Sequence, residues 1–400
     1  MTYAQYRELQ AQGLNLDLTR GKPESRQLDL SNALLALPDD YHDSTGTDVR
    51  NYGGLQGLIE LREIFGELLH VPAADLVAGN NASLEMMNTV LVFSLLHGAS
   101  DSVTPWSAEP KIKFICPVPG YDRHFALLDS YGIEMISVDM RADGPDYEAV
   151  AALVANDPSI KGMWLVPTYS NPTGDTTSTE VAQRLVSMPT AAADFKLFVD
   201  NAYAVHHLTD EETPSADFLQ LAARAGNPDR VFIFGSTSKI THAGSGVAFF
   251  GSSPANVAWY LKHLGATTIG PDKVNQLRHA QFFKNADGVR KQMQAHREIL
   301  EPKFALVEQI LSEELTGLAT WSRPKGGYFV NLDVPEGQAK EVVRLAKEAG
   351  IALTPAGSAF PYGIDPKDTN IRIAPSFPTM EDLEAAIRGL CVCVKSATSA

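Results

Sequence analysis

Short apolar runs, each followed by a segment with helical spacing, fill the middle of this 400-residue sequence and constrain its fold more than any other feature. Most of the runs are apolar throughout rather than alternating, which is typical of strands buried on both faces of a parallel sheet. Helical spacing lies between the runs, as over Glu180–Met188 and Ser215–Ala225. The pattern predicts a doubly wound α/β domain. Its predicted strands are Lys113–Val118, Glu134–Met140, Gly162–Pro167, Lys196–Asn201, Arg230–Ser236 and Gly246–Gly251.

The C-terminal third of the sequence changes to an α+β pattern. Its predicted elements are a long helix over Lys291–Leu315, strands in "GGYFVNLDV", "IALTPAG" and "NIRIAPS", a helix over Ala339–Ala349 and a last helix from Thr379. Because the chain is longer than one average domain, we expect this part to form a smaller second domain. The opening residues are too few to fold alone and are expected to pack on it. The predicted boundaries are 44–295 for the large domain and 1–43 with 296–400 for the small domain.

Composition and charge disfavour several classes of function. The net charge of −15 argues against nucleic acid as a partner, because phosphate binding needs a basic face. No apolar run approaches the roughly 20 residues of a membrane span, and the first residues do not have the pattern of a signal peptide. Cys116, Cys391 and Cys393 fit a reducing compartment, and the last two are too close together for half of a zinc site, so they are interpreted as core residues. A cytoplasmic protein without a membrane partner is expected.

Polar and aromatic side chains follow the predicted strands, at the edge where ligands bind in open parallel sheets. They are Tyr121 after the first strand, Asn171 after the third, Asp200 and Tyr203 at the end of the fourth, and Ser236, Ser238 and Lys239 at the end of the fifth. Taken singly, each has another interpretation, because an aspartate after a strand often caps a helix, and Asn-Pro-Thr-Gly and Ser-Thr-Ser are common in turns and loops.

One ligand accounts for the whole set. A carboxylate, an amide, a phenol, an aromatic face, a lysine and hydroxyls suit a flat heteroaromatic ring with a basic nitrogen, an oxygen, an aldehyde and a phosphate, which describes pyridoxal phosphate. Low dielectric favours the neutral amine of a buried lysine, so Lys239 is predicted to form a Schiff base with the aldehyde. Asp200 is predicted to keep the ring nitrogen protonated, which lets the ring accept electrons.

The phosphate of this cofactor needs a binding site of its own. The turn "GNNA" precedes a predicted helix, and the free N–H groups of Asn81 and Ala82 at the helix start are suited to an anion. N-capping of that helix by Asn80 or Asn81 is the alternative interpretation. The hydroxyls of Ser236 and Ser238 are further candidate donors to the same phosphate.

The order and spacing of these motifs resemble the fold type I, pyridoxal-phosphate-dependent aminotransferases over nearly the whole chain. The motifs that carry the resemblance are Tyr52, "GNNAS" from Gly79, "PGY" ending at Tyr121, "NPTG" from Asn171, "DNAY" from Asp200, "STSK" ending at Lys239, and Arg372. The phrases "TRGKPE" and "SKITHAGSGVAFF" are most similar to the bacterial aspartate aminotransferase subgroup Ic, which is related to regulator-type aminotransferase domains. The resemblance implies a large domain with a mostly parallel seven-stranded sheet flanked by helices, and a small α+β domain.

The resemblance also implies a role for each residue of the cofactor site. Lys239 corresponds to the Schiff-base lysine, which moves a proton between the substrate α-carbon and the cofactor. Asp200 corresponds to the partner of the ring nitrogen. Asn171 and Tyr203 correspond to the pair that hydrogen-bonds the ring hydroxyl, and Tyr121 corresponds to the aromatic side chain that stacks on the ring.

Further positions concern the substrate, the aspartate and a second chain. Arg372 corresponds to the arginine that binds the substrate α-carboxylate through two hydrogen bonds, beside Asn171, with an ordinary ion pair as its alternative. Gly21 corresponds to a glycine whose missing side chain lets the backbone approach that carboxylate. Tyr52 corresponds to a tyrosine that reaches the phosphate of the neighbouring subunit, which implies a homodimer with shared active sites. His124 is at the position of a histidine that some members keep beside the aspartate; a histidine of the core or surface is the equal alternative.

The implied reaction is transamination, with L-aspartate and 2-oxoglutarate giving oxaloacetate and L-glutamate in ping-pong kinetics. An aminotransferase of different or broader specificity and a carbon-sulfur lyase that uses the same cofactor are alternatives. A cofactor-binding sensor domain of a regulator is less favoured, because it would need a basic DNA-binding module and the resemblance leaves no room for one.

The sequence departs from the family at two places. The family's phosphate-binding arginine is replaced by Val247, and "THAGSGVA" contains no arginine or lysine. A dicarboxylic substrate also needs a second cation, and neither Lys273 nor Arg278 is at the family's spacing for it. Arg20, next to Gly21, is the best local candidate, with a surface arginine as the alternative.

Overall fold

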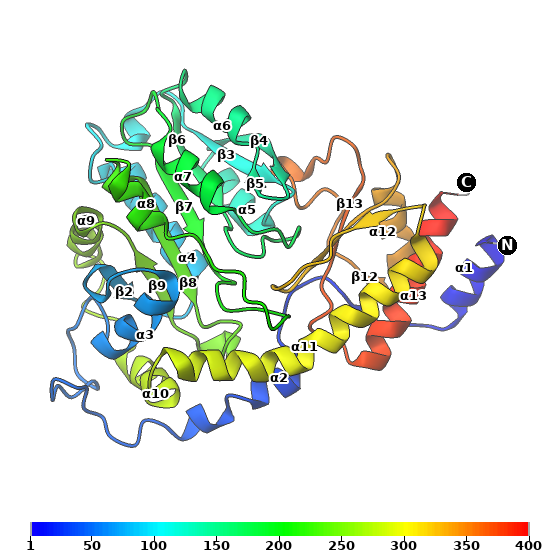
Figure 1. The fold of residues 1–400 in the computed structure, drawn as a ribbon, viewed down its shortest axis with the longest axis horizontal. Helices are drawn as coiled ribbons and strands as arrows, with labels where there is room; N and C mark the ends of the chain where they lie inside the picture. Colours follow the sequence, from blue (N-terminus) through cyan, green and yellow to red (C-terminus); the bar gives the residue numbers. More distant parts are fainter. Residues whose placement is uncertain (1, 399–400) are drawn as a thin grey trace.

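The computed structural model describes residues 2–398 and contains a central sheet of eight strands in the order β2-β9-β8-β7-β6-β3-β4-β5 (Figure 1). β3, β4, β6, β7 and β8 pair in parallel, whereas β9 pairs antiparallel with both β8 and β2. The predicted seven-stranded, mostly parallel sheet is confirmed, and the two-residue β5 extends it at one edge. The strands are β2 (Leu76–Ala78), β3 (Lys113–Val118), β4 (Glu134–Arg141), β5 (Gly144–Pro145), β6 (Ile160–Leu165), β7 (Lys196–Asp200), β8 (Val231–Ser236) and β9 (Ala248–Gly251).

Helices cover both faces of this sheet, which is why its central strands are apolar throughout and almost completely buried. The helices packed on one face are α3 (Ile59–Leu69), α6 (Tyr147–Val154), α7 (Thr179–Ser187), α8 (Phe218–Arg224) and α10 (Lys273–Phe283). Those on the other face are α4 (Ser83–His97), α5 (Asp122–Ser130) and α9 (Pro254–Leu264). The predicted α/β class is therefore confirmed.

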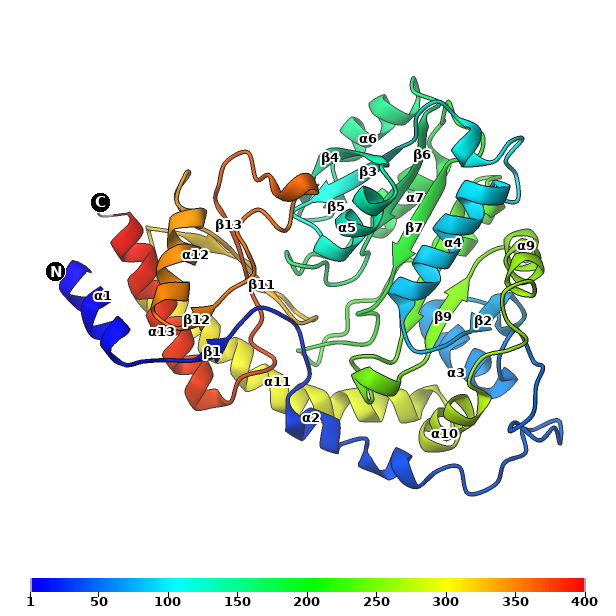
Figure 2. The same cartoon turned by 180° about the vertical axis from the view of Figure 1, so that it is seen from behind.

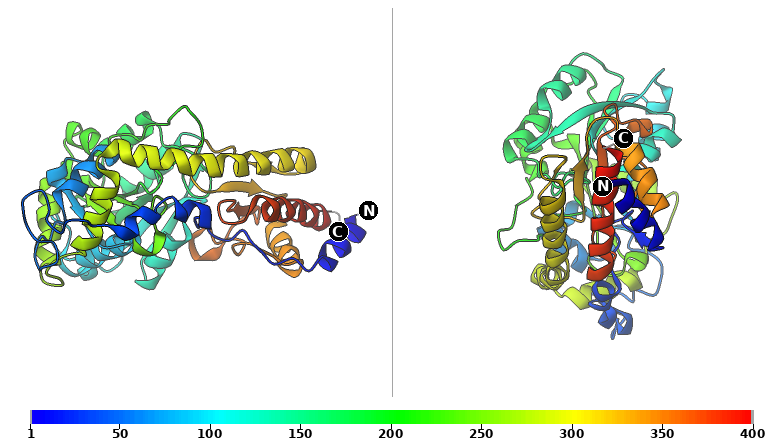
Figure 3. Two further views of the ribbon diagram at one scale, coloured as in Figure 1. Left: turned by 90° about the horizontal axis from the view of Figure 1, so that it is seen from below. Right: turned by 90° about the vertical axis from the view of Figure 1, so that its right-hand side faces the viewer.

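A second, smaller group of elements lies beside the large sheet (Figure 2). It contains an antiparallel sheet, β10-β11-β13, and a parallel pair, β1-β12. The long helix α11 (Ala286–Leu315) extends from the large sheet to this group (Figure 3). The other elements are α1 (Thr2–Ala11), β1 (Leu16–Asp17), β10 (Thr320–Trp321), β11 (Val330–Asp333), α12 (Ala339–Glu348), β12 (Ile351–Ala352), β13 (Asn370–Ile373) and α13 (Met380–Ala397).

The N-terminal segment contacts both groups of elements. Helix α1 packs against α13, and the Tyr6 hydroxyl donates a hydrogen bond to the Leu345 carbonyl oxygen. After the short helix α2 (Ser25–Asp29), the 3-10 helix η1 (Asn32–Ala36) packs instead against α10, where Arg278 donates to the carbonyl oxygen of Leu37. The boundaries 44–295 and 1–43 with 296–400 stay a prediction.

The three cysteines agree with a further expectation from the sequence. Cys116, Cys391 and Cys393 are all buried and unpaired, as expected for core residues. None of the helices within residues 2–398 is long and apolar enough to cross a membrane.

Candidate active site

Most of the predicted site residues lie where the carboxyl ends of β3, β6, β7 and β8 meet the smaller group of elements. Because these strands are parallel, their ends share one edge of the sheet. The loop after β7 crosses to the second group, since the N–H of Gly327 donates to the carbonyl oxygen of His206 and the N–H of Leu208 donates to that of Lys325. The site is thus built from both groups.

Asp200 ends β7 and is held by a histidine. Its Oδ2 lies 3.0 Å from Nε2 of His124 in α5, and the His124 ring stacks on Trp164 of β6 with the ring centroids 4.3 Å apart. Both residues of the pair are buried. Oδ1 of Asp200 is also buried and has no hydrogen-bond partner among the described residues, so one acceptor is left for a ligand that donates a proton. His124 lies beside the aspartate, as the first of its two interpretations predicts.

Lys239 lies in the turn after β8, close to two phenols. Its Nζ is 4.9 Å from the centroid of the Tyr203 ring. Burial raises the pKa of Tyr203, and the neighbouring Asp200 raises it further. Burial also raises the pKa of Tyr121, although the charge of Lys239 opposes that shift. Both phenols are therefore protonated at neutral pH, and the Tyr203 hydroxyl is available as a hydrogen-bond donor.

Arg372 of β13 is buried and makes several polar contacts. Nη1 donates to Oδ1 of Asp122 at 2.9 Å and to Oδ1 of Asn171 at 3.4 Å. Nη2 donates to Oγ1 of Thr354 at 3.1 Å and to the carbonyl oxygen of Thr19 at 3.2 Å. Nε has no partner among the described residues. Arg372 and Asn171 are therefore in contact, and Arg372 also makes the ion pair of its alternative interpretation, with Asp122 as a partner that the sequence analysis did not name.

The two serines after β8 lie against the turn before α4. Oγ of Ser236 accepts from the N–H of Ser238 at 3.4 Å, and Oγ of Ser238 donates to the carbonyl oxygen of Asn81 at 3.5 Å. Gly246 lies beside this contact, and a Cβ there would lie 2.8 Å from Oγ1 of Thr237, so a larger residue would displace that hydroxyl. The predicted donors to a phosphate are thus neighbours.

The start of α4 is not capped by an asparagine side chain, so that interpretation is wrong. The N-cap residue is Ala82, in an extended conformation and without a side-chain cap. Oδ1 of Asn80 instead accepts from the N–H of Asp272. The first N–H groups of α4 therefore have no side-chain partner, which keeps them suited to an anion.

Gly21 and Arg20 have different surroundings. A Cβ on Gly21 would lie 2.8 Å from Cζ of Phe329 and 3.1 Å from Cβ of Tyr328, so a glycine is required for this close contact. Arg20 is exposed, and its guanidinium makes no hydrogen bond or ion pair within residues 2–398. It follows directly on Thr19, the residue that accepts from Arg372.

Tyr52 projects from the surface, with 83% of its area exposed. Lys273 of α10 holds the loop of Tyr52 in place. Its Nζ donates to the carbonyl oxygens of Asn51 at 2.8 Å and Gly53 at 2.6 Å. Lys273 therefore has a structural role. Tyr52 borders an open hollow of about 490 Å³ formed with residues 270–274.

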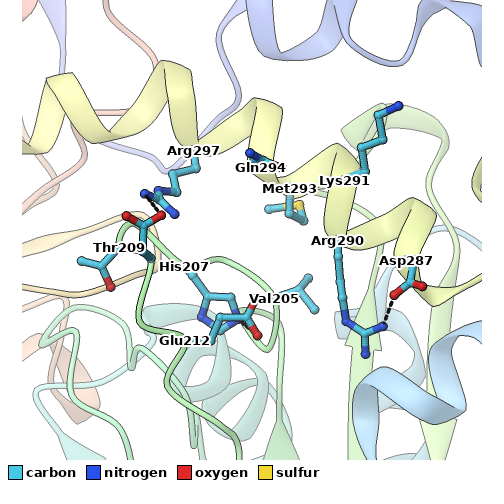
Figure 4. Close-up of a pocket in the computed structure, with 11 residues that line it drawn as sticks. Val205, His207, Thr209, Glu212, Asp287, Arg290, Lys291, Met293, Gln294 and Arg297 are labelled. Carbon is cyan, nitrogen blue, oxygen red and sulfur yellow. Dashed lines mark hydrogen bonds and ion pairs between the residues drawn. The ribbon is translucent and has the colours of Figure 1, made fainter.

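Another hollow, of about 460 Å³, lies between the loop after β7 and the first half of α11 (Figure 4). Its arginines are already paired, since Arg297 contacts Asp210 and Arg290 contacts Asp287, each at 2.7 Å. None of the predicted site residues lines it, and it is not assigned to the candidate active site.

Comparison with known proteins identifies the family of the chain. The aspartate amino-transferase family matches residues 1–400. The chain belongs to the aspartate aminotransferase family. As an aminotransferase of this family it has the pyridoxal-phosphate-dependent fold type I expected from the sequence.

Similar proteins align with nearly the whole length of this aminotransferase. It is 64% identical to a protein of Mycolicibacterium smegmatis assigned to the aminotransferases, over 97% of this chain and 92% of the other. It is 54% identical to the aspartate aminotransferase of Corynebacterium glutamicum, over 97% of this chain and 90% of the other. The crystal structure of an aspartate transaminase from Corynebacterium glutamicum has a TM-score of 0.98 at 52% identity, and the match covers 100% of this chain and 95% of that chain.

The family implies pyridoxal phosphate as the cofactor, and the residues of this aminotransferase fit it. The unpartnered Oδ1 of Asp200 suits a protonated ring nitrogen. The protonated hydroxyl of Tyr203 suits an anionic ring oxygen. The amine of Lys239 lies beside the Tyr203 ring, where it suits the aldehyde carbon.

Four residues of this aminotransferase site were not predicted from the sequence: Asp122, Trp164, Thr19 and Thr354. Asp122 directly follows Tyr121, so its position in the sequence was a usable signal. Trp164 lies within an apolar strand and is indistinguishable there from a core residue. Thr19 contacts Arg372 across more than half of the chain length, and Thr354 contacts it from 18 residues away; no local pattern indicates either contact.

Proposed function

We propose that this aminotransferase transfers the amino group of L-aspartate to 2-oxoglutarate, giving oxaloacetate and L-glutamate. The name of its Corynebacterium glutamicum relative supports aspartate as the donor. The observation that carries the reaction type is the buried, unpartnered Oδ1 of Asp200 beside Tyr203 and Lys239. An acceptor without a donor in a buried site is costly unless a ligand completes it.

In the proposed site, four side chains hold the cofactor ring. Asp200 keeps a proton on the ring nitrogen, and His124 orients the carboxylate through Oδ2. Asn171 and Tyr203 donate hydrogen bonds to the ring oxygen, and Tyr121 stacks on the ring. When bound, pyridoxal phosphate supplies an aldehyde that forms a bond with amines and a ring that accepts an electron pair.

Lys239 moves the proton of the reaction. With pyridoxal phosphate bound, the Lys239 amine would hold its aldehyde group until an incoming amino acid takes that place. The Nζ freed in this way would take the proton from the substrate α-carbon and move it to the cofactor. The same steps in reverse order serve the 2-oxo acid, which predicts ping-pong kinetics.

Two arginines bind the substrate carboxylates in this proposal. Arg372 takes the α-carboxylate, with Asn171 beside it, and the free Nε and the buried setting favour such a contact. Arg20 takes the side-chain carboxylate of a dicarboxylic substrate, because it is an unpaired cation that follows directly on a residue in contact with Arg372.

The phosphate and the second subunit complete the proposed site. Ser236 donates its hydroxyl to the phosphate, and Ser238 does so by turning its hydroxyl from the Asn81 carbonyl oxygen. Asn81 and Ala82 donate N–H groups at the start of α4. Tyr52 contacts the phosphate bound in a second copy of the chain, since within one chain its side chain lies in solvent. The working unit is therefore a homodimer.

A screen of half-reactions tests the proposal. The purified protein, loaded with cofactor, is mixed with single amino acids while the cofactor absorbance between about 360 and 430 nm is followed. Aspartate and glutamate are expected to bleach this band, and alanine and aromatic amino acids to act far more slowly. If neither aspartate nor glutamate changes the absorbance, the proposed dicarboxylic substrate is rejected. Release of pyruvate and ammonia from one amino acid without an acceptor identifies a lyase instead.

A further inference from the structure

The turn that carries Lys239 runs from Thr237 to Thr241. The N–H groups of Ile240 and Thr241 both donate to the carbonyl oxygen of Thr237, which closes the turn. Lys239 lies at its centre, with one threonine two residues away on each side. Side chains that hydrogen-bond to the two threonines or to the carbonyl groups of this turn therefore also set the position of the Lys239 side chain.

His279 of α10 lies beside the two threonines of the turn. The residues that contact the His279 ring determine which of its nitrogens carries the proton. Nδ1 is 2.8 Å from the carbonyl oxygen of Asn275, which can only accept, so Nδ1 carries the proton. Nε2 is then an acceptor. Oγ1 of Thr241 lies 2.9 Å from Nε2 and donates to it.

The hydrogen bonds continue from Thr241 to Thr237. The two hydroxyl oxygens are 3.2 Å apart, and Oγ1 of Thr237 accepts from the N–H of Val247 at 2.9 Å. Val247 occupies the position where the resemblance places a phosphate-binding arginine. The same chain of hydrogen bonds therefore fixes the backbone at this position and the turn that carries Lys239.

His296 of α11 holds the carbonyl side of the turn. Its Nε2 is 2.9 Å from the carbonyl oxygen of Ile240, so this nitrogen carries the proton. Its Nδ1 accepts from Nε2 of Gln27 at 3.0 Å, and the orientation of the Gln27 amide is fixed because its Oε1 accepts from the N–H of Glu24. The two histidines thus carry their protons on opposite ring nitrogens.

Tyr328 adds a further bond on the carbonyl side. Nε2 of Gln27 also donates to the Tyr328 hydroxyl at 3.0 Å, and that hydroxyl donates to the carbonyl oxygen of Lys239 at 3.3 Å. Two consecutive carbonyl groups of the turn, those of Lys239 and Ile240, are therefore held by one buried network.

We propose that His279 and His296 are positioning residues for Lys239, which hold its turn from opposite sides as neutral imidazoles protonated on Nδ1 in His279 and on Nε2 in His296. The proposal rests on the role of Lys239 given under the proposed function. Neither histidine is in the set of residues that touch substrate or cofactor; both act through the backbone and the threonines of the turn.

Burial supports the neutral state of both rings. It lowers the pKa of His279 to about 4, against the opposing effect of the Asn275 carbonyl. It also lowers the pKa of His296, against the opposing effect of the Ile240 carbonyl. A second proton on Nε2 of His279 would remove the acceptor for Thr241, and one on Nδ1 of His296 would face the Gln27 amide donor. Charge on either ring would therefore release the turn.

Neutron diffraction from crystals of the holoenzyme grown near neutral pH tests the protonation directly. The expected result is a deuteron on Nδ1 but not Nε2 of His279, and on Nε2 but not Nδ1 of His296. Two deuterons on either ring, or the reverse assignment, would overturn the proposal. This result does not depend on activity, so it remains interpretable if the proposed donor aspartate is wrong.

Paired variants test the positioning role. Glutamine can replace the Nε2 group of either histidine as acceptor or donor, whereas leucine can do neither. We expect His279→Leu and His296→Leu to lower kcat by about 10²-fold with little change in KM, because small displacements of a reacting group are costly. They should also move the pH midpoint of the cofactor absorbance change, which reports protonation at the Lys239 nitrogen. In His279→Gln and His296→Gln, kcat and the pH midpoint of the absorbance change should be close to the wild-type values.

Val307→Ala is the matched control, because Val307 is fully buried in α11 but belongs to the core of the smaller group of elements. It should lower the melting temperature and leave kcat and the absorbance midpoint unchanged. Leucine variants that match wild type in both readouts would overturn the positioning role. So would glutamine variants as impaired as the leucine variants, since that result would indicate a packing effect alone.

Discussion

Asp122 and Arg372 form a largely buried ion pair, with Oδ1 of Asp122 2.9 Å from Nη1 of Arg372. Asp122 begins α5 and Arg372 lies in β13, so the pair joins the large sheet to the smaller one. It also places a carboxylate where the proposed substrate carboxylate binds. The two carboxylates compete for one guanidinium.

The first prediction concerns this competition. Asp122→Asn should tighten the binding of a non-reactive dicarboxylate such as succinate by about fivefold, or about 1 kcal/mol, because the ligand then no longer competes with a charged carboxylate for Arg372. Titration of the holoenzyme by cofactor absorbance measures the affinity. Asp129→Asn, on the exposed side of the same helix, is the control and should have no effect. Weaker binding to Asp122→Asn would contradict the competition and indicate that Asp122 orients Arg372 instead.

The second prediction concerns the unpartnered oxygen of Asp200. Asp200→Asn keeps the shape of the side chain but removes the charge that stabilises a proton on the ring nitrogen. We expect kcat to fall by about 10³-fold at saturating cofactor. Steady-state kinetics measures this effect, and the far-ultraviolet circular dichroism spectrum should be unchanged. A kcat close to that of wild type would remove Asp200 from the proposed mechanism.

The third prediction concerns substrate choice through Arg20. Arg20→Gln should lower kcat/KM for aspartate by about 10- to 100-fold, the usual range for loss of a charged hydrogen bond, and leave the slow reaction with alanine unchanged. The kcat/KM of Arg20→Lys for aspartate should lie between those of wild type and Arg20→Gln, because lysine keeps the charge without the paired donors. Equal losses for aspartate and alanine would mean that Arg20 does not contact the substrate side chain.

The fourth prediction is a pH dependence of stability. The pKa of His279 is held at about 4 by burial, and the nearby His242 and Arg278 lower it further, while Asp272 and the Asn275 carbonyl act in the opposite direction. An unfolded histidine has a pKa near 6.5, so between about pH 6.5 and 4 the unfolded chain binds a proton that the folded chain does not. Stability therefore falls as the pH decreases through this range, by up to about 3 kcal/mol from this group.

Melting temperatures measured from pH 7 to pH 4.5 test this dependence. His279→Gln should show a smaller decrease over the range than wild type. His97→Gln, at an exposed position in α4, is the control and should follow wild type. An identical decrease in His279→Gln and wild type would show that His279 does not contribute to the acid sensitivity.

Much of the fold could be predicted because its strands are apolar on both faces. The predicted run Lys113–Val118 coincides with β3, and the ends of the other five strands predicted for the large sheet differ by at most two residues. The edge strand β5 was missed, since its two residues, Gly144 and Pro145, carry no apolar pattern. Helix α11 begins at Ala286, five residues before its predicted start at Lys291, because Asn285 caps it with a side-chain oxygen.

The candidate site was predictable where its residues follow strands, and less so where they meet through tertiary contacts. Lys239, Asp200 and Asn171 were found because each follows a buried strand. The partners of Arg372 and the histidines behind Lys239 come from elements far away in the sequence, such as α10 and α11. Contacts of this kind depend on packing, and no local spacing indicates them.

The most direct test of the central claim is the half-reaction of Lys239→Ala with L-aspartate. Wild-type protein loaded with cofactor should lose its absorbance between about 360 and 430 nm after aspartate is added, as the amino group is transferred. In Lys239→Ala the loss should be abolished, because the amine that moves the proton is removed. A rate in Lys239→Ala equal to that of wild type would contradict the account.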